Sequence, residues 1–279
     1  MRYARCERQG REFFAAVEDD EVVEVSELPF DGADPRPNGR RHALDEVTLL
    51  PPVMPGTFYA AGFNYKAHNR HHEDLGYDPV KVGPHPEVGY RAQSALVGHG
   101  AGILKPADVE GRFETEAEVV AVIGRAIKHA TRAEAQQAVF GWTIGNDVSA
   151  RTWQHADRTF WRAKNADSFK PMGPWIETGV DPLTSTTTVR RNGVVDASFA
   201  TGDMIFDPYD FIVEMTKYIT LRPGDVLWMG ADGNTSMDVG DVIDIEITGI
   251  GTLTNTVVAS RPHTVVGETA GTDTERMLS

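Results

Sequence analysis

Residues 116–124 read EAEVVAVIG, an apolar run that begins with two acids. In a β-strand the side chains alternate between two faces, so Glu116 and Glu118 would share one face with Val120. Two neighbouring carboxylates repel each other, which raises the pKa of both unless a cation lies between them. For an isolated pair of this kind, a strand end that emerges into water is the commoner arrangement, because buried acids are rare. The run predicts a strand and leaves the role of its acids open.

A second apolar run, residues 142–149, also leads into an acid, Asp147. Three carboxylates with no cluster of histidines or cysteines suit a hard, oxygen-seeking cation such as Mg²⁺, Mn²⁺ or Ca²⁺. Structural zinc would require softer ligands. The spacing alone does not decide between such a site and a solvated strand end.

The composition describes a globular chain with many turns. The 279 residues are 41% hydrophobic and 24% charged, with Gly 27 and Pro 16, which favours a strand-rich fold. Lysine and arginine number 27 against 41 acids, so the formal charge is 27 − 41 = −14. This charge argues against nucleic-acid and anionic-membrane partners, which require a basic surface. We expect the function to lie in a pocket where a metal and a few arginines reverse the local potential.

The location predicted for the chain is the cytoplasm. Cys6 is the single cysteine, so an intramolecular disulfide is excluded and a reducing compartment fits. The amino-terminal residues mix arginines with glutamates and contain no apolar stretch, so no signal peptide is expected. The best apolar run, residues 119–123, is too short to span a bilayer.

Local signals place several elements. Two β-type runs within residues 13–25 predict a hairpin, and a Pro- and Gly-rich stretch at 29–41 predicts a loop. A capping-box pattern begins a predicted helix at 131–140. Asn192-Gly193 predicts a two-residue hairpin turn. Asp followed by Pro begins another predicted helix, at about 208–220.

These signals divide the chain into three parts. We predict a small β-containing amino-terminal domain at 1–50, a catalytic domain at 51–267, and a disordered tail at 268–279. Within the second part, residues 76–89 contain three prolines and resist both helix and central strand. A lid over the site, extending from about His68 to Gly89, is the expectation for this region.

Several ordered blocks of the chain resemble the signature blocks of the fumarylacetoacetate hydrolase family, in both order and spacing. The resemblance covers roughly residues 55–258. Its blocks are Gly62 to Tyr65 with His68, Glu116 to Gly124, Asn146 to Arg151 with Gln154, Lys164 with Asp167, Pro171 to Trp175, Asn192-Gly193, Thr201 to Phe206, Arg222 to Val226, and Gly249 to Leu253.

The resemblance implies a fold and an assembly. The fold is α+β, with a catalytic domain built as a mixed β-sandwich roll or partly open barrel, beside the small amino-terminal domain. The resemblance also implies a homodimer.

The resemblance implies a metal centre as well. Glu116, Glu118 and Asp147 match the family's metal ligands, and Mg²⁺ is the expected ion. Arg151 and Gln154 match positions that contact substrate, and a guanidinium suits a carboxylate.

Four further positions complete the predicted site. Lys164 matches the family's active-site lysine, whose cation can stabilise an oxyanion or enolate. Tyr65 and Arg91 are predicted to bind substrate; Arg91 stands where the family commonly has lysine. His68 matches the histidine that many members use as general base, and His71 stands where many have a glutamate. We expect the two histidines to form the base together.

The function implied is cleavage of a C–C bond in a 2,4-dioxoacid or acylpyruvate-like substrate, through an enolate stabilised by the metal. The alternative on the same metal site is an isomerase or decarboxylase of 2-oxo or 2-hydroxymuconate-type acids, which requires no activated water. Two other classes are disfavoured. A non-catalytic binding module would not need all three carboxylates, and a nucleotide-binding enzyme would need a glycine-rich phosphate motif, which the sequence lacks.

Overall fold

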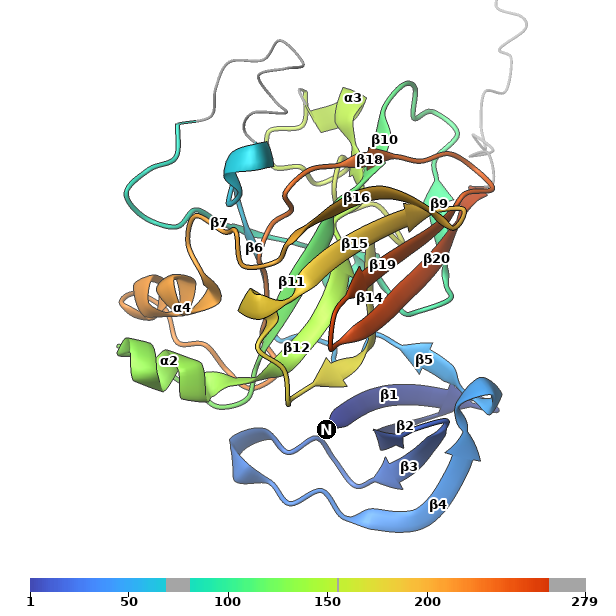
Figure 1. Cartoon of the computed structure of the whole chain (residues 1–279), viewed down its shortest axis with the longest axis vertical. Helices are drawn as coiled ribbons and strands as arrows, with labels where there is room; N and C mark the ends of the chain where they lie inside the picture. Colours follow the sequence, from blue (N-terminus) through green and yellow to red (C-terminus); the bar gives the residue numbers. More distant parts are fainter. Residues whose placement is uncertain (69–80, 155, 261–279) are drawn as a thin grey trace, which may run out of the picture.

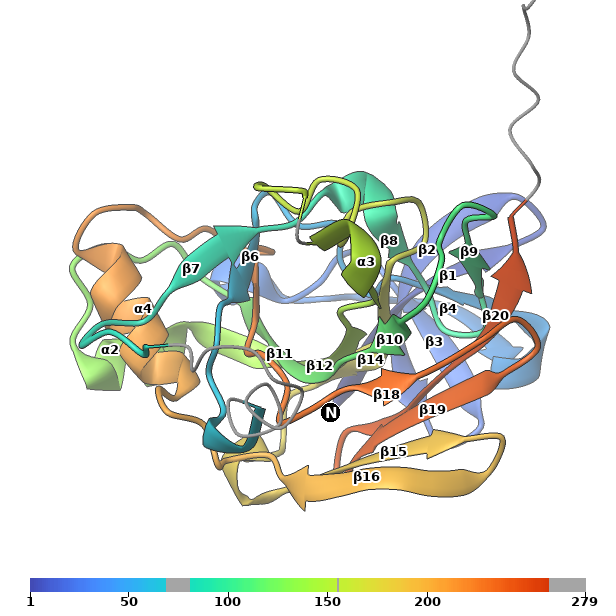
Figure 2. The ribbon, with the colours of Figure 1, turned by 90° about the horizontal axis from the view of Figure 1, so that it is seen from above.

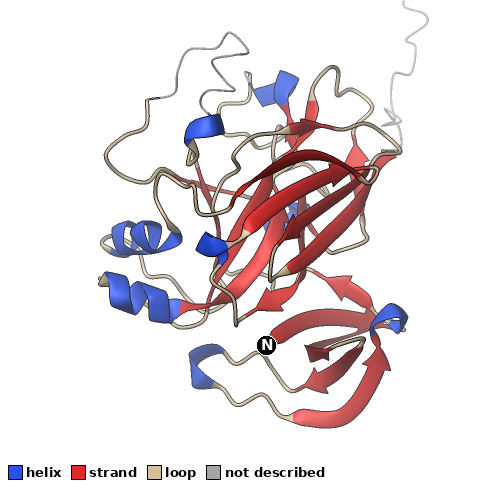
Figure 3. Ribbon diagram, in the orientation of Figure 1, coloured by secondary structure: helices blue, strands red, loops and turns tan. Residues whose placement is uncertain are grey.

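The computed structural model describes residues 1–68, 81–154 and 156–260. Over these residues the chain is mainly strands with a few short helices (Figure 3). The α+β class predicted from the sequence is confirmed, and the sheets remain open rather than closing into a barrel. The predicted lid lies partly and the predicted tail wholly outside the described residues. Among the described residues, no helix is both long and apolar enough to cross a membrane.

The amino-terminal residues form a set of antiparallel strands at the lower end of the molecule (Figure 1). The strands are β1 (Arg2–Arg8), β2 (Arg11–Glu18), β3 (Glu21–Val25), β4 (Pro37–Ala43) and β5 (Thr48–Leu50). The predicted hairpin is confirmed by β2 and β3. The predicted loop at 29–41 is wrong in part, because β4 pairs with β3 there. Almost all of β4 is exposed, so its sequence lacks the alternation of apolar residues that marks a half-buried strand.

Glu24 of β3 is an acid buried inside this amino-terminal sheet, with 1% of its surface exposed. Arg11 pairs with its carboxylate, Asn38 donates at 2.8 Å, and His42 Nε2 lies 2.7 Å away. Burial alone would raise the pKa of Glu24, but these partners lower it to about 2 from the usual 4.5. The ionised carboxylate therefore stabilises the folded chain.

Glu24→Gln is expected to lower the free energy of unfolding near pH 7 by about 1.5–3 kcal/mol, the usual contribution of hydrogen bonds to a charged group. Because the pKa is depressed in the folded state, this stabilisation is complete above pH 4.5 and is lost as the pH falls toward 2. Urea titrations near pH 7 and at about pH 3.5 measure it. The difference in free energy of unfolding between wild type and variant is expected to be smaller at the lower pH. An equal difference at both pH values would contradict a stabilising role for the ionised Glu24 carboxylate.

A large sheet continues from the amino-terminal strands and forms one layer of the molecule. After β1 it runs through β14 (Lys170–Glu177), β12 (Val139–Asn146), β11 (Ala117–Ile123), β17 (Val226–Trp228), β6 (Phe58–Ala61) and β7 (Val88–Tyr90). β8 (Leu96–Val97) pairs with β14. A second sheet has the order β16 (Val194–Ala200), β15 (Thr186–Arg191), β19 (Val242–Ile247), β20 (Gly251–Ala259) and β9 (Gly102–Lys105). Figure 2 shows the two layers from above.

The main core fills the space between these two sheets. Val119 and Ala121 of β11 belong to one buried cluster with Ile243 and Ile245 of β19. The opposite face of β11, with Val120, packs in a second cluster. Because β11 is buried on both faces, it reads as a continuous apolar run rather than an alternating one.

Short helices and a small sheet complete the fold. The helices are α2 (Arg132–Ala138), α3 (Arg151–Gln154) and α4 (Pro208–Thr216), with 3-10 turns at Phe30–Gly32, Leu44–Glu46, Gln93–Ala95 and Pro182–Thr184. The small sheet has the order β13 (Ser149–Ala150), β10 (Phe113–Thr115), β18 (Thr235–Ser236).

Both predicted helices begin where expected and end too early. Capping boxes open α2 at Thr131 and α4 at Asp207. However, α2 ends at Ala138, because the chain turns directly into β12 and pairs with β11. The other helix, α4, ends at Thr216 rather than near Thr220. The predicted Asn192-Gly193 turn between β15 and β16 is confirmed.

Candidate metal centre

The pairing of β11 with β12 brings the three predicted acids together. Glu118 lies opposite Gly145, and the next residue beyond β12 on that side is Asp147. The Asp147 N–H donates to the carbonyl of Glu116 at 2.9 Å. Glu118 lies within β11, whereas Glu116 lies just before the strand. Ligand oxygens of all three acids lie within 4.8 Å of one another, and the three side chains are buried.

Asp147 is surrounded by cations. Arg91 donates to both of its oxygens, from Nε at 3.0 Å and from Nη2 at 2.9 Å. The ammonium of Lys164 lies 2.6 Å from Oδ2, and that of Lys170 lies 2.7 Å from Oδ1. Burial alone would raise the pKa of Asp147, but the three cations hold it well below its usual range. Asp147 is therefore ionised in the folded protein.

Glu116 is the second paired acid. Arg151 Nη2 donates to Oε1, and Lys164 Nζ lies 2.5 Å from Oε2. Burial would raise the pKa of Glu116, but Arg151 and Lys164 lower it to about 2. Lys164 thus contacts both Glu116 and Asp147, which places a cation between two of the predicted ligands.

Glu118 differs from the other two acids. It accepts a hydrogen bond from the Gly230 N–H at 2.7 Å, and no lysine or arginine of the described chain forms an ion pair with it. Burial, with the charges of Asp147 and Glu116, raises its pKa to about 8. Gly230 has φ +81°, a backbone conformation that is strained for residues with a side chain. Glycine is therefore required at the position whose N–H donates to Glu118.

The donor set fits a divalent cation. Three carboxylates are the oxygen ligands that Mg²⁺ and Mn²⁺ prefer, and Glu118 would become a stable anion once such a cation lay beside it. Glu116, Glu118 and Asp147 would hold the ion. The preference for Mg²⁺ over Mn²⁺ stays a prediction.

His68 lies beside this cluster at the end of the described segment 1–68. Its Nδ1 is 3.0 Å from the carbonyl of Ala231, which can only accept, so Nδ1 carries the proton and Nε2 keeps a lone pair. Burial lowers its pKa below the usual 6.5, with Glu116 raising it and Arg151 lowering it. His68 is therefore neutral near pH 7.

The remaining predicted residues have the following positions. The Tyr65 hydroxyl is buried and donates to the carbonyl of Thr201 at 2.7 Å. Gln154 accepts from Arg151 Nη1 at 2.9 Å. His71 lies outside the described residues. Substrate contacts for Tyr65, Gln154, Arg91 and Arg151 stay predictions. The ion pairs of the two arginines are with acids of the protein itself.

Two charged residues at this centre were not singled out from the sequence. Lys170 is fully buried and contacts Asp147, and burial lowers its pKa to about 7. Its signal was a lysine directly before the apolar residues 171–176. Glu114 is 1% exposed and pairs with Arg151. The alternation that led to Glu116 and Glu118 extends back to this residue, so period two would have found it.

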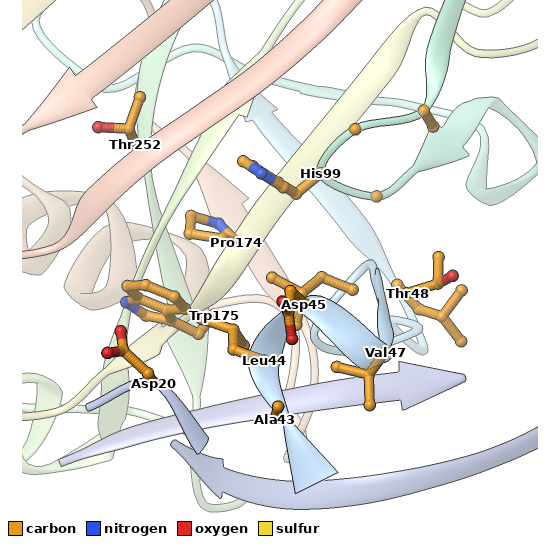
Figure 4. Close-up of a pocket in the computed structure, with 15 residues that line it drawn as sticks. Asp20, Ala43, Leu44, Asp45, Val47, Thr48, His99, Pro174, Trp175 and Thr252 are labelled. Atoms are coloured by element: carbon orange, nitrogen blue, oxygen red, sulfur yellow. The ribbon is translucent and has the colours of Figure 1, made fainter. Parts of the chain in front are cut away.

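A cavity of about 1020 Å³ lies elsewhere in the molecule. Figure 4 shows side chains of the segment between β4 and β5, such as Leu44 and Val47, lining it together with Trp175 and His99. Glu116, Glu118 and Asp147 are not among its lining residues. We place the chemistry at the carboxylate cluster, because the cavity brings together no comparable group of ionisable side chains.

Comparison with known proteins shows to which family the chain belongs. A family model described as fumarylacetoacetate (FAA) hydrolase C-terminal matches residues 57–258, which contain all three acids. The chain belongs to the fumarylacetoacetate hydrolase family. A second model, Rv2993c-like N-terminal, matches residues 1–52. The family predicted from the sequence motifs is confirmed.

Relatives within the fumarylacetoacetate hydrolase family differ in the reactions their names state. Protein Rv2993c of Mycobacterium tuberculosis is 36% identical over 84% of this chain and 87% of its own length. The 5-carboxymethyl-2-hydroxymuconate delta-isomerase of Mycobacterium smegmatis is 34% identical, with a TM-score of 0.82 over 93% of this chain and 100% of that chain.

A hydrolase of Sphingobium sp. SYK-6 is also similar. This maleylpyruvate hydrolase, solved with manganese(II) and pyruvate, is 25% identical, with a TM-score of 0.75 over 94% of this chain and all of that chain. Isomerases and hydrolases of the family therefore share the fold found here.

Proposed function

We propose that this chain is a divalent-metal-dependent isomerase that moves a proton within a 2-hydroxymuconate-type or related 2-oxoacid. The observation that carries the proposal is the 3.0 Å contact between His68 Nδ1 and the carbonyl of Ala231, from which the tautomer follows. The Nδ1–H of His68 is held by this carbonyl, so Nε2 is a neutral base. The charges of Glu116, Arg151 and Lys164 act on the pKa of His68, which supports a position of this side chain beside the cation-rich centre.

The charges of the centre suit an anionic substrate. Glu116, Glu118 and Asp147 face Arg91, Lys164 and Lys170, so the described acids and cations nearly balance before any ion is added. A bound divalent cation would supply Lewis-acid stabilisation of negative charge on the 2-oxo oxygen. Lys164 would stabilise the same developing charge. The net positive potential then favours a substrate with two negative charges.

The proton balance fits isomerisation. His68 Nε2 would take the proton from the 2-hydroxyl group, and a proton would be returned to carbon along the conjugated chain. The O–H bond is broken, a C–H bond is formed and the double bonds shift, so the carbon skeleton stays intact and no water is consumed. The neutral state of His68 is the one that this first step requires.

C–C bond hydrolysis is the second candidate. The similarity to a maleylpyruvate hydrolase solved with manganese(II) and pyruvate favours it. Hydrolysis requires an activated water as well as a base. In the described chain His68 is hydrogen bonded to a backbone carbonyl rather than to a carboxylate. Any contribution of His71 to this step lies outside the described residues.

His68→Gln is expected to lower kcat for isomerisation about a hundredfold or more, because the base is removed. Wild-type activity is expected to hold as the pH falls to 6.5 and to decline below it, because the pKa of His68 lies lower than 6.5. The variant should lack this decline. Ultraviolet absorbance of the enol, with Mn²⁺ or Mg²⁺ present, measures turnover, and deuterium uptake from heavy water locates the proton transfer.

A substrate panel separates the two candidates. It comprises a 2-hydroxymuconate-type diacid, oxaloacetate and an acylpyruvate. Isomerisation predicts deuterium uptake without cleavage of the carbon skeleton. Faster cleavage of the acylpyruvate than isomerisation of the diacids would establish the hydrolase. Full turnover by His68→Gln would place the base elsewhere.

Three other properties belong to this proposal. The protein would act as a homodimer in the cytoplasm, with a small-molecule 2-oxoacid as its partner, and with neither nucleic acid nor membrane bound. The net charge of −14 supports the exclusion of nucleic acid.

A further inference from the structure

Glu114 is a buried acid next to the metal centre that is not one of its three candidate ligands. It lies in β10, opposite Ser149 of β13 and Ser236 of β18. Only 1% of its surface is exposed. Arg112 donates to Oε1 at 2.6 Å and Arg151 Nε donates to Oε2 at 2.7 Å. Both oxygens are therefore held by guanidinium groups, and Glu114 does not belong to the cluster of Glu116, Glu118 and Asp147.

The contact with Glu114 fixes how Arg151 is oriented. A guanidinium is planar, so a hydrogen bond at Nε determines the direction of the two Nη groups. Nη1 donates to Gln154 at 2.9 Å, and Nη2 donates to Glu116. With Nε held by Glu114, the tip of Arg151 points to the metal centre. Side-chain acceptors are thus placed at all three nitrogens.

Glu114 also limits how strongly Arg151 neutralises Glu116. Arg151 lies between two acids and shares its single charge between them. Without the Glu114 carboxylate, the guanidinium would be free to turn Nε and Nη2 together onto Glu116 in a bidentate pair. That pair would engage the Glu116 carboxylate, which is a candidate metal ligand, with two hydrogen bonds. It would also turn the Nη groups of Arg151 away from an incoming anion.

We propose that Glu114 is a positioning residue that holds Arg151 toward the metal centre so that Arg151 can bind the carboxylate of an anionic ligand. The inference rests on the proposed function only in taking Arg151 to face the substrate. Glu114 itself touches neither ligand nor metal. It acts through the orientation of one guanidinium.

Oxalate binding to the Mn²⁺-loaded protein, measured by titration calorimetry, tests the proposal. Oxalate carries the adjacent oxygens of a 2-oxoacid and requires no turnover. Glu114→Gln is expected to weaken oxalate binding about 10- to 100-fold, the range found when a partner behind a ligand-contacting group is removed. Glu114→Asp, which keeps the charge but shortens the reach, is expected to restore part of the loss.

Glu24→Gln is the matched control. Glu24 is likewise 1% exposed and paired with an arginine, but it lies in the amino-terminal sheet. This variant is expected to lose stability and to bind oxalate as the wild type does. A merely structural role for Glu114 would give the same result for both acids.

A double-mutant cycle with Arg151→Lys shows whether Glu114 acts through Arg151. The lysine ammonium has no planar array of donors, so it cannot pair with Glu114 and point toward the metal centre at the same time. If the proposal holds, the double variant loses little more oxalate affinity than Arg151→Lys alone. Additive losses overturn it, as does wild-type oxalate binding by a folded Glu114→Gln protein. If the oxalate-binding results are as expected but the protein shows no isomerase activity, the proposed reaction is rejected and the positioning role of Glu114 is retained.

Discussion

Glu118→Gln is expected to lower the affinity for Mn²⁺ at least about a thousandfold, since even changes behind a ligand cost 10- to 100-fold. The metal-free variant is expected to be as stable as the wild type near pH 7, or more stable. Burial and the neighbouring acids raise the pKa of Glu118 to about 8, so its ionised form destabilises the folded state. A neutral amide removes that penalty and keeps an acceptor for the Gly230 N–H.

Two measurements test this prediction. Calorimetric titration with Mn²⁺ gives the affinity, and thermal melting in EDTA gives the stability without metal. Unchanged Mn²⁺ binding would remove Glu118 from the ligand set. A large loss of stability in EDTA would mean that Glu118 has a structural role which the contacts of the described chain do not explain.

Asp147→Asn is expected to destabilise the metal-free protein by about 3–5 kcal/mol, the cost of leaving buried charges without their partner. Arg91, Lys164 and Lys170 all contact this carboxylate. An asparagine retains the shape but not the charge. Metal binding is expected to be lost as well. Asp147→Asn and Glu118→Gln should therefore both weaken Mn²⁺ binding, whereas only Asp147→Asn should lower the free energy of unfolding.

Urea denaturation in EDTA measures the effect of Asp147→Asn. Lys170→Met provides the matched test, because Lys170 is fully buried and would be left next to a neutral amide. The double variant is expected to regain part of the lost stability. A single variant within about 1 kcal/mol of the wild type would contradict the charge network, since that is the range of solvent-screened pairs.

The sequence predicted the parts of the site that depend on local pattern. Alternation placed Glu116 and Glu118 on one side of a strand, and their convergence with Asp147 is observed. Caps predicted the starts of α2 and α4, because capping is decided within four residues. The end of α2 was predicted poorly, since the pairing of β12 with β11 decides where that helix stops.

Lys170, one of the two missed residues, depends on a contact between distant segments. Lys170 reaches Asp147 because β14 pairs with β12, a register that no local signal specifies. Arg91, whose contact with substrate stays a prediction, pairs with Asp147 across 56 residues of sequence. A basic side chain that is predicted to bind an anionic substrate can also pair with an acid of the protein, and the tertiary fold determines which acid lies within reach.

The shared packing around β11 has a consequence for the history of the chain. Two separate family models match residues 1–52, called here the amino-terminal module, and residues 57–258. Yet Tyr3 and Leu28 belong to the same buried cluster as Val120 and Trp228, and β1 extends the sheet at β14. The amino-terminal module therefore packs on one face of β11, the strand that follows Glu116 of the carboxylate cluster. Exchange of this module between relatives would require matched changes on the back of β11, so the two modules are constrained to evolve as one packing unit.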